Sequence, residues 1–140
     1  MKTLPILVTL AVVGLGATAQ AAAPADMARL HIDAVAGGDV AKITSQYGAA
    51  TSLNWVGGPL NGTYVGPQQL AAVWGKFAKA NSPLKATIGD IKQSGNPAGT
   101  TVTADVSFAG KSTIKVRYVM LYRGDQLIDE VWQIDPKAAY

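Results

Sequence analysis

Apolar and polar positions follow two different periods along the chain. In most of the first half, apolar residues recur every three or four positions, which is typical of amphipathic helices. After Pro83 they recur at every second position, which is typical of half-buried strands. The pattern therefore predicts a mainly helical first half and a β-sheet second half.

Two short helices are expected to form a hairpin at the start of this pattern. The first ends at Gly37-Gly38, because glycine readily adopts the left-handed conformation that closes a helix. The second begins after Asp39, a residue type that caps helix N-termini, and ends at Gly48. The residues that share an apolar face are Met27, Leu30, Ala34 and Val35 in the first helix and Val40, Ile43 and Tyr47 in the second.

A third helix follows two short strands. The strands are predicted at residues 51–56 and 63–65, because Gly-Pro and Asn-Gly turn signals separate them. Pro67 opens the helix, since proline is favoured at the first helical position, and Asn81-Ser82-Pro83 ends it. Its buried side carries Leu70, Val73, Trp74 and Phe77.

Four long antiparallel strands are predicted in the second half, at residues 84–92, 101–108, 114–122 and 126–135. The alternation in the first of them slips at Gly89-Asp90, which indicates a β-bulge. The second strand is regular, and the last two form a hairpin around Arg123-Gly124-Asp125. The side chains expected on the buried face of the second strand are Val102, Ala104, Val106 and Phe108.

The length of the hairpin loop predicts which side chains share a face. A loop of two or four residues pairs even positions of one strand with odd positions of the other. The interior face then carries Val116, Tyr118, Met120, Asp129, Val131, Gln133 and Asp135. The outer face carries Arg117, Val119, Leu121, Ile128, Glu130, Trp132 and Ile134.

This order of elements is an α+β layout, and several short motifs give it a family resemblance. The motifs are Gly-Gly-Asp between two helices within residues 34–47, Leu53-Asn54-Trp55, the turn at residues 62–66 and the stretch 70–74. Together they resemble the nuclear transport factor 2-like superfamily, in particular its SnoaL-like and ketosteroid-isomerase-like members. The resemblance implies a cone-shaped, curved antiparallel sheet packed against three helices, also called cystatin-like, with a cavity at the wide end. It also implies pairing through the outer face of the sheet.

The isomerase-like members provide a test of catalytic chemistry. By this resemblance, their aspartate base, oxyanion-binding tyrosine and protonated acid correspond to Trp55, Leu30 and Tyr118. An indole cannot abstract a proton and a leucine cannot donate a hydrogen bond. Steroid-isomerase chemistry of that form is therefore excluded.

Other polar residues remain candidates for acid–base chemistry. His31, the single histidine, is either a structural histidine at the edge of the apolar helix face or a catalytic or ligand-binding group. Asp129 and Asp135 are placed on the interior face, where Tyr47 and Tyr118 offer partner hydroxyls. One alternative is therefore a dehydratase, isomerase or cyclase that uses a pocket aspartate with a tyrosine.

Our main interpretation is a protein that binds a small hydrophobic or amphipathic molecule in an aromatic-lined cavity. The candidate ligand-binding residues are Leu30, Tyr47, Leu53, Trp55, Trp74, Val116, Tyr118, Met120, Val131 and Gln133. The outer face of the sheet is unusually apolar, which predicts a homodimer. The residues expected at that interface are Val119, Leu121, Ile128, Trp132 and Ile134. A further alternative is a dimeric interaction protein whose cavity is filled.

The first 21 residues predict export. Lys2 precedes an apolar run from Leu4 to Gly16, and Ala19-Gln20-Ala21 is a small-x-small cleavage site. The run is shorter than the roughly 20 residues that span a bilayer. We therefore expect a signal peptide at residues 1–21, cleavage after Ala21 and a mature domain of residues 22–140 without a membrane span. The expected location is periplasmic or secreted.

Charge and composition restrict the classes of partner and cofactor that the sequence predicts. The formal net charge of +3 includes Lys2, so the mature domain carries about +2, and its basic residues are scattered singly. We therefore expect no nucleic-acid partner, because phosphate backbones are bound by clustered basic residues. The chain has no cysteine and one histidine. A disulfide is excluded, and we expect no metal and no cofactor.

Overall fold

The computed structural model describes residues 22–140, which form three helices and six strands. The predicted signal peptide at residues 1–21 lies outside the described residues. The elements are α1 (Pro24–Gly37), α2 (Val40–Thr44), β1 (Tyr47–Val56), β2 (Gly62–Val65), α3 (Pro67–Asn81), β3 (Lys85–Asn96), β4 (Gly99–Ala109), β5 (Thr113–Arg123) and β6 (Gln126–Ile134).

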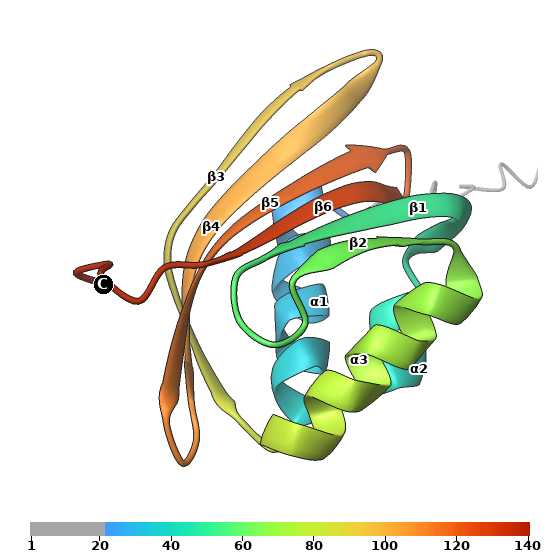
Figure 1. Ribbon diagram of the computed structural model, residues 1–140. Coiled ribbons are helices and arrows are strands. Elements are labelled where there is room, and N and C mark those ends of the chain that lie inside the picture. Colours follow the sequence, from blue (N-terminus) through green and yellow to red (C-terminus); the bar gives the residue numbers. More distant parts are fainter. Residues whose placement is uncertain (1–21) are drawn as a thin grey trace, which may run out of the picture.

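All six strands belong to one sheet, in the order β2-β1-β6-β5-β4-β3. The sheet curves around α1, and the three helices lie on its concave side (Figure 1). Neighbouring strands are antiparallel except β1 and β6, which are parallel. A parallel pair needs a long connection, and here β2, α3 and three further strands provide it. The predicted α+β fold with a curved sheet and three helices is confirmed, with one parallel pair in a sheet expected to be antiparallel.

The helix ends follow the local signals in the sequence. Gly38 closes α1 in a left-handed conformation with φ of 70°, and its N–H donates to the carbonyl oxygens of Ala34 and Val35. The Asp39 carboxylate accepts the Lys42 N–H at 3.1 Å, which caps α2. Pro67 stands in the first turn of α3. Among residues 22–140, no helix is both long enough and apolar enough to cross a membrane.

Tyr47 was predicted on the second helix, but it is the first residue of β1. Helix α2 ends at Thr44, and the Gln46 carbonyl oxygen accepts the Leu127 N–H at 2.8 Å. Tyr47 then pairs with Leu127 across the parallel strands. Pairing with a strand some 80 residues away in the chain overrides the helical spacing, because the backbone groups gain partners in the sheet.

Strands β3 and β4 confirm the predicted alternation. The register between them shifts between Gly89 and Lys92, and Asp90 has a φ of 34°, so the predicted bulge is present. The side chains on the concave face of β4 are all buried, namely Val102, Ala104, Val106 and Phe108.

A second bulge, which was not predicted, lies in β6. The turn pairs Arg123 with Gln126 and Tyr122 with Leu127, as the loop length predicts. The next pair is Leu121 with Asp129, so β6 uses two residues where β5 uses one. Beyond this bulge, even-numbered residues pair with even-numbered residues.

The predicted facing of β6 is therefore wrong beyond the turn. Met120 pairs with Glu130 and Tyr118 pairs with Trp132, and all four side chains are fully buried. Val119 pairs with Val131 on the other face. The residues moved from the predicted interior to the convex face are Asp129, Val131 and Gln133, and those moved inward are Glu130, Trp132 and Ile134.

Aromatic side chains fill the concave side between the sheet and the helices. Trp132 packs against Trp74 with 5.3 Å between ring centroids and stacks on Phe108 at 5.1 Å. Trp55 and Phe77 pack on the same two tryptophans. The middle of the cone is thus a packed core.

Candidate functional site

The Glu130 carboxylate is the centre of a buried polar cluster. Its Oε1 accepts a hydrogen bond from the Tyr118 hydroxyl and lies 2.7 Å from His31 Nε2. Its Oε2 accepts the Tyr47 hydroxyl at 2.6 Å. The His31, Tyr118 and Glu130 side chains are fully buried. Two tyrosine hydroxyls thus donate to one carboxylate, with the His31 imidazole at hydrogen-bond distance, which offsets much of the cost of removing the carboxylate from water.

Five elements of the fold contribute to this group. His31 lies on α1, Tyr47 begins β1, and Tyr118 and Glu130 are diagonal neighbours on the paired strands β5 and β6. Trp74 on α3 completes the group, because its Nε1–H donates to the Tyr47 hydroxyl at 2.6 Å. We call these five residues the Glu130 cluster. The cluster connects helices α1 and α3 to strands β1, β5 and β6.

Burial controls the charge state of the two tyrosines in the Glu130 cluster. Desolvation raises the pKa of Tyr118 and of Tyr47 well above the usual value, and the negative charge of Glu130 raises both further. Both hydroxyls therefore remain protonated donors. His31 Nδ1 has no hydrogen-bond partner within residues 22–140, so the hydrogen-bond contacts of the imidazole to the cluster are all made by Nε2.

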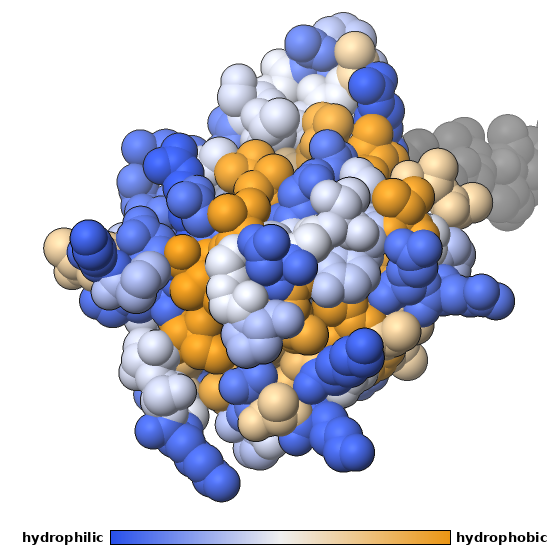
Figure 2. Space-filling view, viewed as in Figure 1, coloured by the Kyte–Doolittle hydropathy of each residue, from blue (hydrophilic) through white to orange (hydrophobic). Residues whose placement is uncertain are grey.

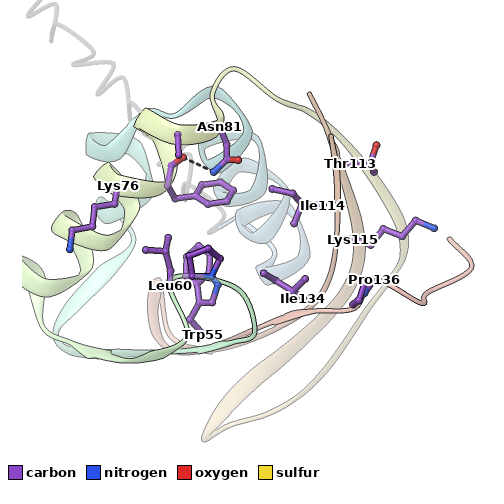
Figure 3. Close-up of a pocket in the computed structure, with 12 residues that line it drawn as sticks. Trp55, Leu60, Lys76, Asn81, Thr113, Ile114, Lys115, Ile134 and Pro136 are labelled. Carbon is purple, nitrogen blue, oxygen red and sulfur yellow. Dashed lines mark hydrogen bonds between the residues drawn. The ribbon is translucent and has the colours of Figure 1, made fainter. Parts of the chain in front are cut away.

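A pocket of about 390 Å³ lies outside the Glu130 cluster. It opens between the loop that follows β1, the C-terminal half of α3, the start of β5 and the end of β6 (Figure 3). Most of its wall is apolar. The apolar side chains are Trp55, Pro59, Leu60, Phe77, Ala80, Ile114, Ile134 and Pro136. In the space-filling view, apolar surface lies left of centre with hydrophilic side chains around it (Figure 2).

An aromatic layer separates the pocket from the Glu130 cluster. Trp55 lines the pocket, and its ring centroid lies 5.2 Å from that of Trp74, which bonds to Tyr47. Phe77 also lines the pocket and packs edge-on against Trp74. Within the described part of the chain, the pocket wall contains no carboxylate and no histidine. The acid–base groups therefore lie behind the pocket wall.

Comparison with known families identifies the domain. A family model described as a SnoaL-like domain matches residues 28–127, which is more than half of the chain. The chain belongs to the SnoaL-like domain family. No curated protein matches it significantly.

Solved structures agree with this SnoaL-like fold. A nuclear transport factor 2-like protein of unknown function from Pseudomonas putida aligns with a TM-score of 0.66 and 15% identity, over 80% of this chain and 85% of that chain. An uncharacterised protein with a cystatin-like fold from Caulobacter vibrioides gives 0.64 and 15%, over 81% and 89%. A SnoaL-like protein of unknown function from Burkholderia thailandensis gives 0.62 and 18%, over 79% and 92%. Similarity at these identities shows the fold alone.

The pocket of this SnoaL-like domain shares one residue, Trp55, with the predicted ligand-binding set. Tyr47 and Tyr118 belong to the Glu130 cluster. Leu30 is 64% exposed on α1 and does not line this pocket. The predicted residues in the packed core are Leu53, Trp74, Val116 and Met120, and those on the convex face are Val131 and Gln133.

The two candidate aspartates of the SnoaL-like domain lie apart from the Glu130 cluster. Asp129 faces the convex side, where its Oδ1 accepts the Ser52 hydroxyl at 2.7 Å. Asp135 follows β6, and its backbone N–H donates to the Lys115 carbonyl oxygen at 2.8 Å. His31, Tyr47 and Tyr118 do come together, but around Glu130 rather than around an aspartate.

The residues predicted at a dimer interface of the SnoaL-like domain lie in different parts of the structure. Trp132 is fully buried in the core and Ile134 lines the pocket. Val119 and Leu121 lie on the convex face and are partly buried, and Ile128 lies at the bulge. Among residues 22–140, no three potential metal-ligating side chains converge.

Sequence reasoning missed Glu130 because it assumed a regular hairpin. One signal could have shown the error, since Leu127-Ile128 places two apolar residues in succession and breaks the alternation, as Gly89-Asp90 does in β3. The pocket had no comparable signal. Leu60, Phe77 and Ile114 come from three separate segments that only the tertiary structure brings together.

Proposed function

We propose that this protein binds a small, mainly apolar molecule in the pocket beside α3. The observation that carries the proposal is the apolar pocket wall, which in the described residues has no carboxylate or histidine to perform acid–base chemistry. A volume of about 390 Å³ falls in the range of small-molecule sites. Membership in the SnoaL-like family supports a ligand-binding or isomerase-type role.

A blocking substitution tests this proposal. Ala80 is exposed on α3 and lines the pocket, so Ala80→Trp places a large side chain in the opening without altering the core. Ala72→Trp is the matched control, because Ala72 is exposed on the same helix but away from the pocket. With N-phenyl-1-naphthylamine as a fluorescent probe, we expect binding by the wild type and Ala72→Trp and at least tenfold weaker binding by Ala80→Trp. Equal binding by all three proteins, or none by the wild type, contradicts the proposal.

Acid–base catalysis is a second candidate function, and the composition of the Glu130 cluster favours it. A carboxylate, an imidazole and two tyrosine hydroxyls are groups that enzymes use to move protons. The cluster must then open to substrate, although His31 and Glu130 are fully buried in this structure. His31 is the single histidine, so its reaction with diethyl pyrocarbonate in untagged protein reports access directly. Rapid modification in the native state favours catalysis, whereas protection until unfolding favours a structural cluster.

We also propose that residues 1–21 direct export and are removed. The support is the sequence pattern alone: Lys2, the apolar run Leu4–Gly16 and the small residues before position 22. Intact-mass measurement of the protein from a periplasmic or secreted fraction tests this. The expected chain begins at Ala22, and a cytoplasmic protein that retains Met1 contradicts the proposal.

Self-association through the convex face of the sheet is a further proposal. Val119 and Val131 pair there next to Leu121, which leaves apolar side chains on a face without a helix (Figure 1). Sedimentation at micromolar concentration should show a dimer for the wild type and for Thr87→Lys on edge strand β3. Val131→Lys should be monomeric. A monomeric wild type contradicts this proposal without affecting the pocket.

A further inference from the structure

Trp55 indicates a more specific ligand for the pocket. Its side chain is only 3% exposed and forms part of the pocket wall, between Leu60 and Ile134 (Figure 3). Its Nε1–H is buried without a hydrogen-bond partner among residues 22–140. A buried donor that lacks an acceptor is costly, because it has lost its hydrogen bond to water. The surrounding side chains close this atom off from the pocket space, so a ligand acceptor that displaces them and pairs with the N–H removes that cost.

Of the other polar side chains at or near this wall, Trp74 and Asn81 each donate a hydrogen bond within the protein, and Thr113 is exposed at the start of β5. Trp74 Nε1–H donates to Tyr47, and Asn81 Nδ2 donates to the Phe77 carbonyl oxygen at 3.0 Å. Trp132 Nε1 also lacks a partner in the described part of the chain, but Trp132 does not line the pocket. Of the three tryptophans, Trp55 alone combines a free indole N–H with a place on the pocket wall.

The charged residues at the pocket do not point into it. Lys76 and Lys115 contribute to the wall, but their ammonium ends are directed away from the enclosed space, to opposite sides (Figure 3). Lys115 Nζ donates to the Ala138 carbonyl oxygen at 2.6 Å. An ionised group inside the pocket therefore has no counter-charge in this structure, and burying an unpaired charge is strongly unfavourable.

We propose that the pocket takes an uncharged, mainly apolar molecule with a carbonyl or similar oxygen acceptor, to which Trp55 Nε1–H donates a hydrogen bond. This inference rests on the proposed ligand-binding function and adds its chemical class. The apolar wall holds the body of the ligand by excluding water, and the single indole N–H orients it. Trp55 is then the residue that determines specificity.

Three probes of nearly equal shape test the proposal: 2-acetylnaphthalene, 2-ethylnaphthalene and 2-naphthoate. They present a neutral acceptor, no acceptor and an anion. Affinities are measured for the wild type, Trp55→Phe and Trp132→Phe, where Trp132→Phe removes a similar buried indole that is not on the pocket wall. We expect Trp55→Phe to weaken binding of the ketone about fivefold to tenfold, which corresponds to the net contribution of one hydrogen bond. The affinity for the hydrocarbon should change less than twofold in Trp55→Phe. Trp132→Phe should leave the ratio of the affinities for ketone and hydrocarbon unchanged.

Nuclear magnetic resonance of the wild type provides a readout that needs no variant. The ketone should move the indole N–H resonance of Trp55 downfield relative to its position with the hydrocarbon, since both probes have the same ring system. Naphthoate should bind at least tenfold more weakly than the ketone. If no probe binds, the proposed function itself fails. If the ketone and hydrocarbon respond equally to Trp55→Phe and give the same resonance, or if naphthoate binds most tightly, binding stands and the inferred ligand class is wrong.

Discussion

Glu130 has a local environment that makes its charge state important for stability. Its two oxygens accept from Tyr118 and Tyr47, Oε1 lies 2.7 Å from His31 Nε2, and the Glu130 side chain is fully buried. Glu130→Gln replaces one acceptor oxygen by an N–H₂ group that faces a donor. We expect a loss of about 2 to 4 kcal/mol in the free energy of unfolding, measured by urea denaturation.

The neighbouring residue provides the control for this prediction. Asp129 lies on the convex face, partly exposed, and bonds to Ser52. Asp129→Asn keeps an oxygen acceptor for that bond and should change stability by less than about 1 kcal/mol. Equal losses in the two variants mean that the β6 bulge does not place the two carboxyl groups on opposite faces.

Buried tyrosines make stability fall in alkaline solution. Desolvation raises the pKa of Tyr47, Tyr118 and Tyr122 above the usual value, and the charge of Glu130 adds to it. Tyrosine in the unfolded chain ionises near pH 10. The stabilisation is therefore fully present below about pH 10, and is lost as the pH rises from there toward the raised native pKa values.

Between the unfolded and the native pKa, the free energy of unfolding is expected to fall by about 1.4 kcal/mol per pH unit for each of these tyrosines. Unfolding free energies measured from about pH 8 to about pH 12, with phenolate absorbance followed in parallel, check the prediction. Urea-unfolded protein is the reference, since all five tyrosines ionise together there. Ionisation of every tyrosine near pH 10 in the native state is the contrary result.

At the scale of an element, the end of α1 depends on one glycine and not on its neighbour. Gly38 has a positive φ of 70°, and a Cβ there lies 2.5 Å from the Ser82 hydroxyl oxygen. Gly37 is helical, and a Cβ there meets no atom of the described structure within 4 Å. The two positions therefore respond in opposite directions to the same substitution.

We expect Gly38→Ala to destabilise the protein by at least about 2 kcal/mol, because left-handed backbone and steric overlap both oppose alanine. Gly37→Ala should stabilise it by about 0.5 to 1 kcal/mol through its higher helix propensity. Thermal unfolding of the two variants beside the wild type is the measurement. A stabilising Gly38→Ala contradicts the observed helix end.

The β6 bulge decides which side chains of this strand face the interior of the molecule. It turns Glu130 and Trp132 inward together, so the polar cluster and the aromatic core share one cause. Without the bulge, the alternation places Asp129 and Val131 inside, as the turn length alone predicts. One extra residue in a strand thus decides which carboxylate is buried.

At the scale of the whole molecule, ligand binding and stability are linked. A probe that binds only the native state raises the free energy of unfolding by about 2.7 kcal/mol at a concentration 100 times its dissociation constant. For a domain of this size the melting temperature then rises by on the order of 10 °C. With 2-acetylnaphthalene at the same concentration, we expect this rise for the wild type and Ala72→Trp, and at most about half of it for Ala80→Trp, whose binding is at least tenfold weaker. A rise in Ala80→Trp of the same size means that the probe binds elsewhere.

The sequence by itself determined the elements whose causes are local. Helix α1 ends where Gly38 permits a left-handed residue, α3 begins at Pro67, and β3 bulges at Gly89-Asp90, all as predicted. These features depend on backbone preferences of one or two residues, so they are visible without the rest of the chain. The α+β class follows from the order of such elements, and the family resemblance follows from short motifs within residues 34–74, in agreement with the match to the SnoaL-like family model.

Only the tertiary structure decided the site. Tyr47 left its predicted helix to pair with β6, and an unpredicted bulge exchanged the faces of Asp129 and Glu130. The pocket combines Trp55, Phe77 and Ile114 from separate elements. Side-chain facing in a strand has a period of two, so one extra residue reverses it, whereas helix caps act within a single turn. For that reason the sequence predicted the fold well and the polar site poorly.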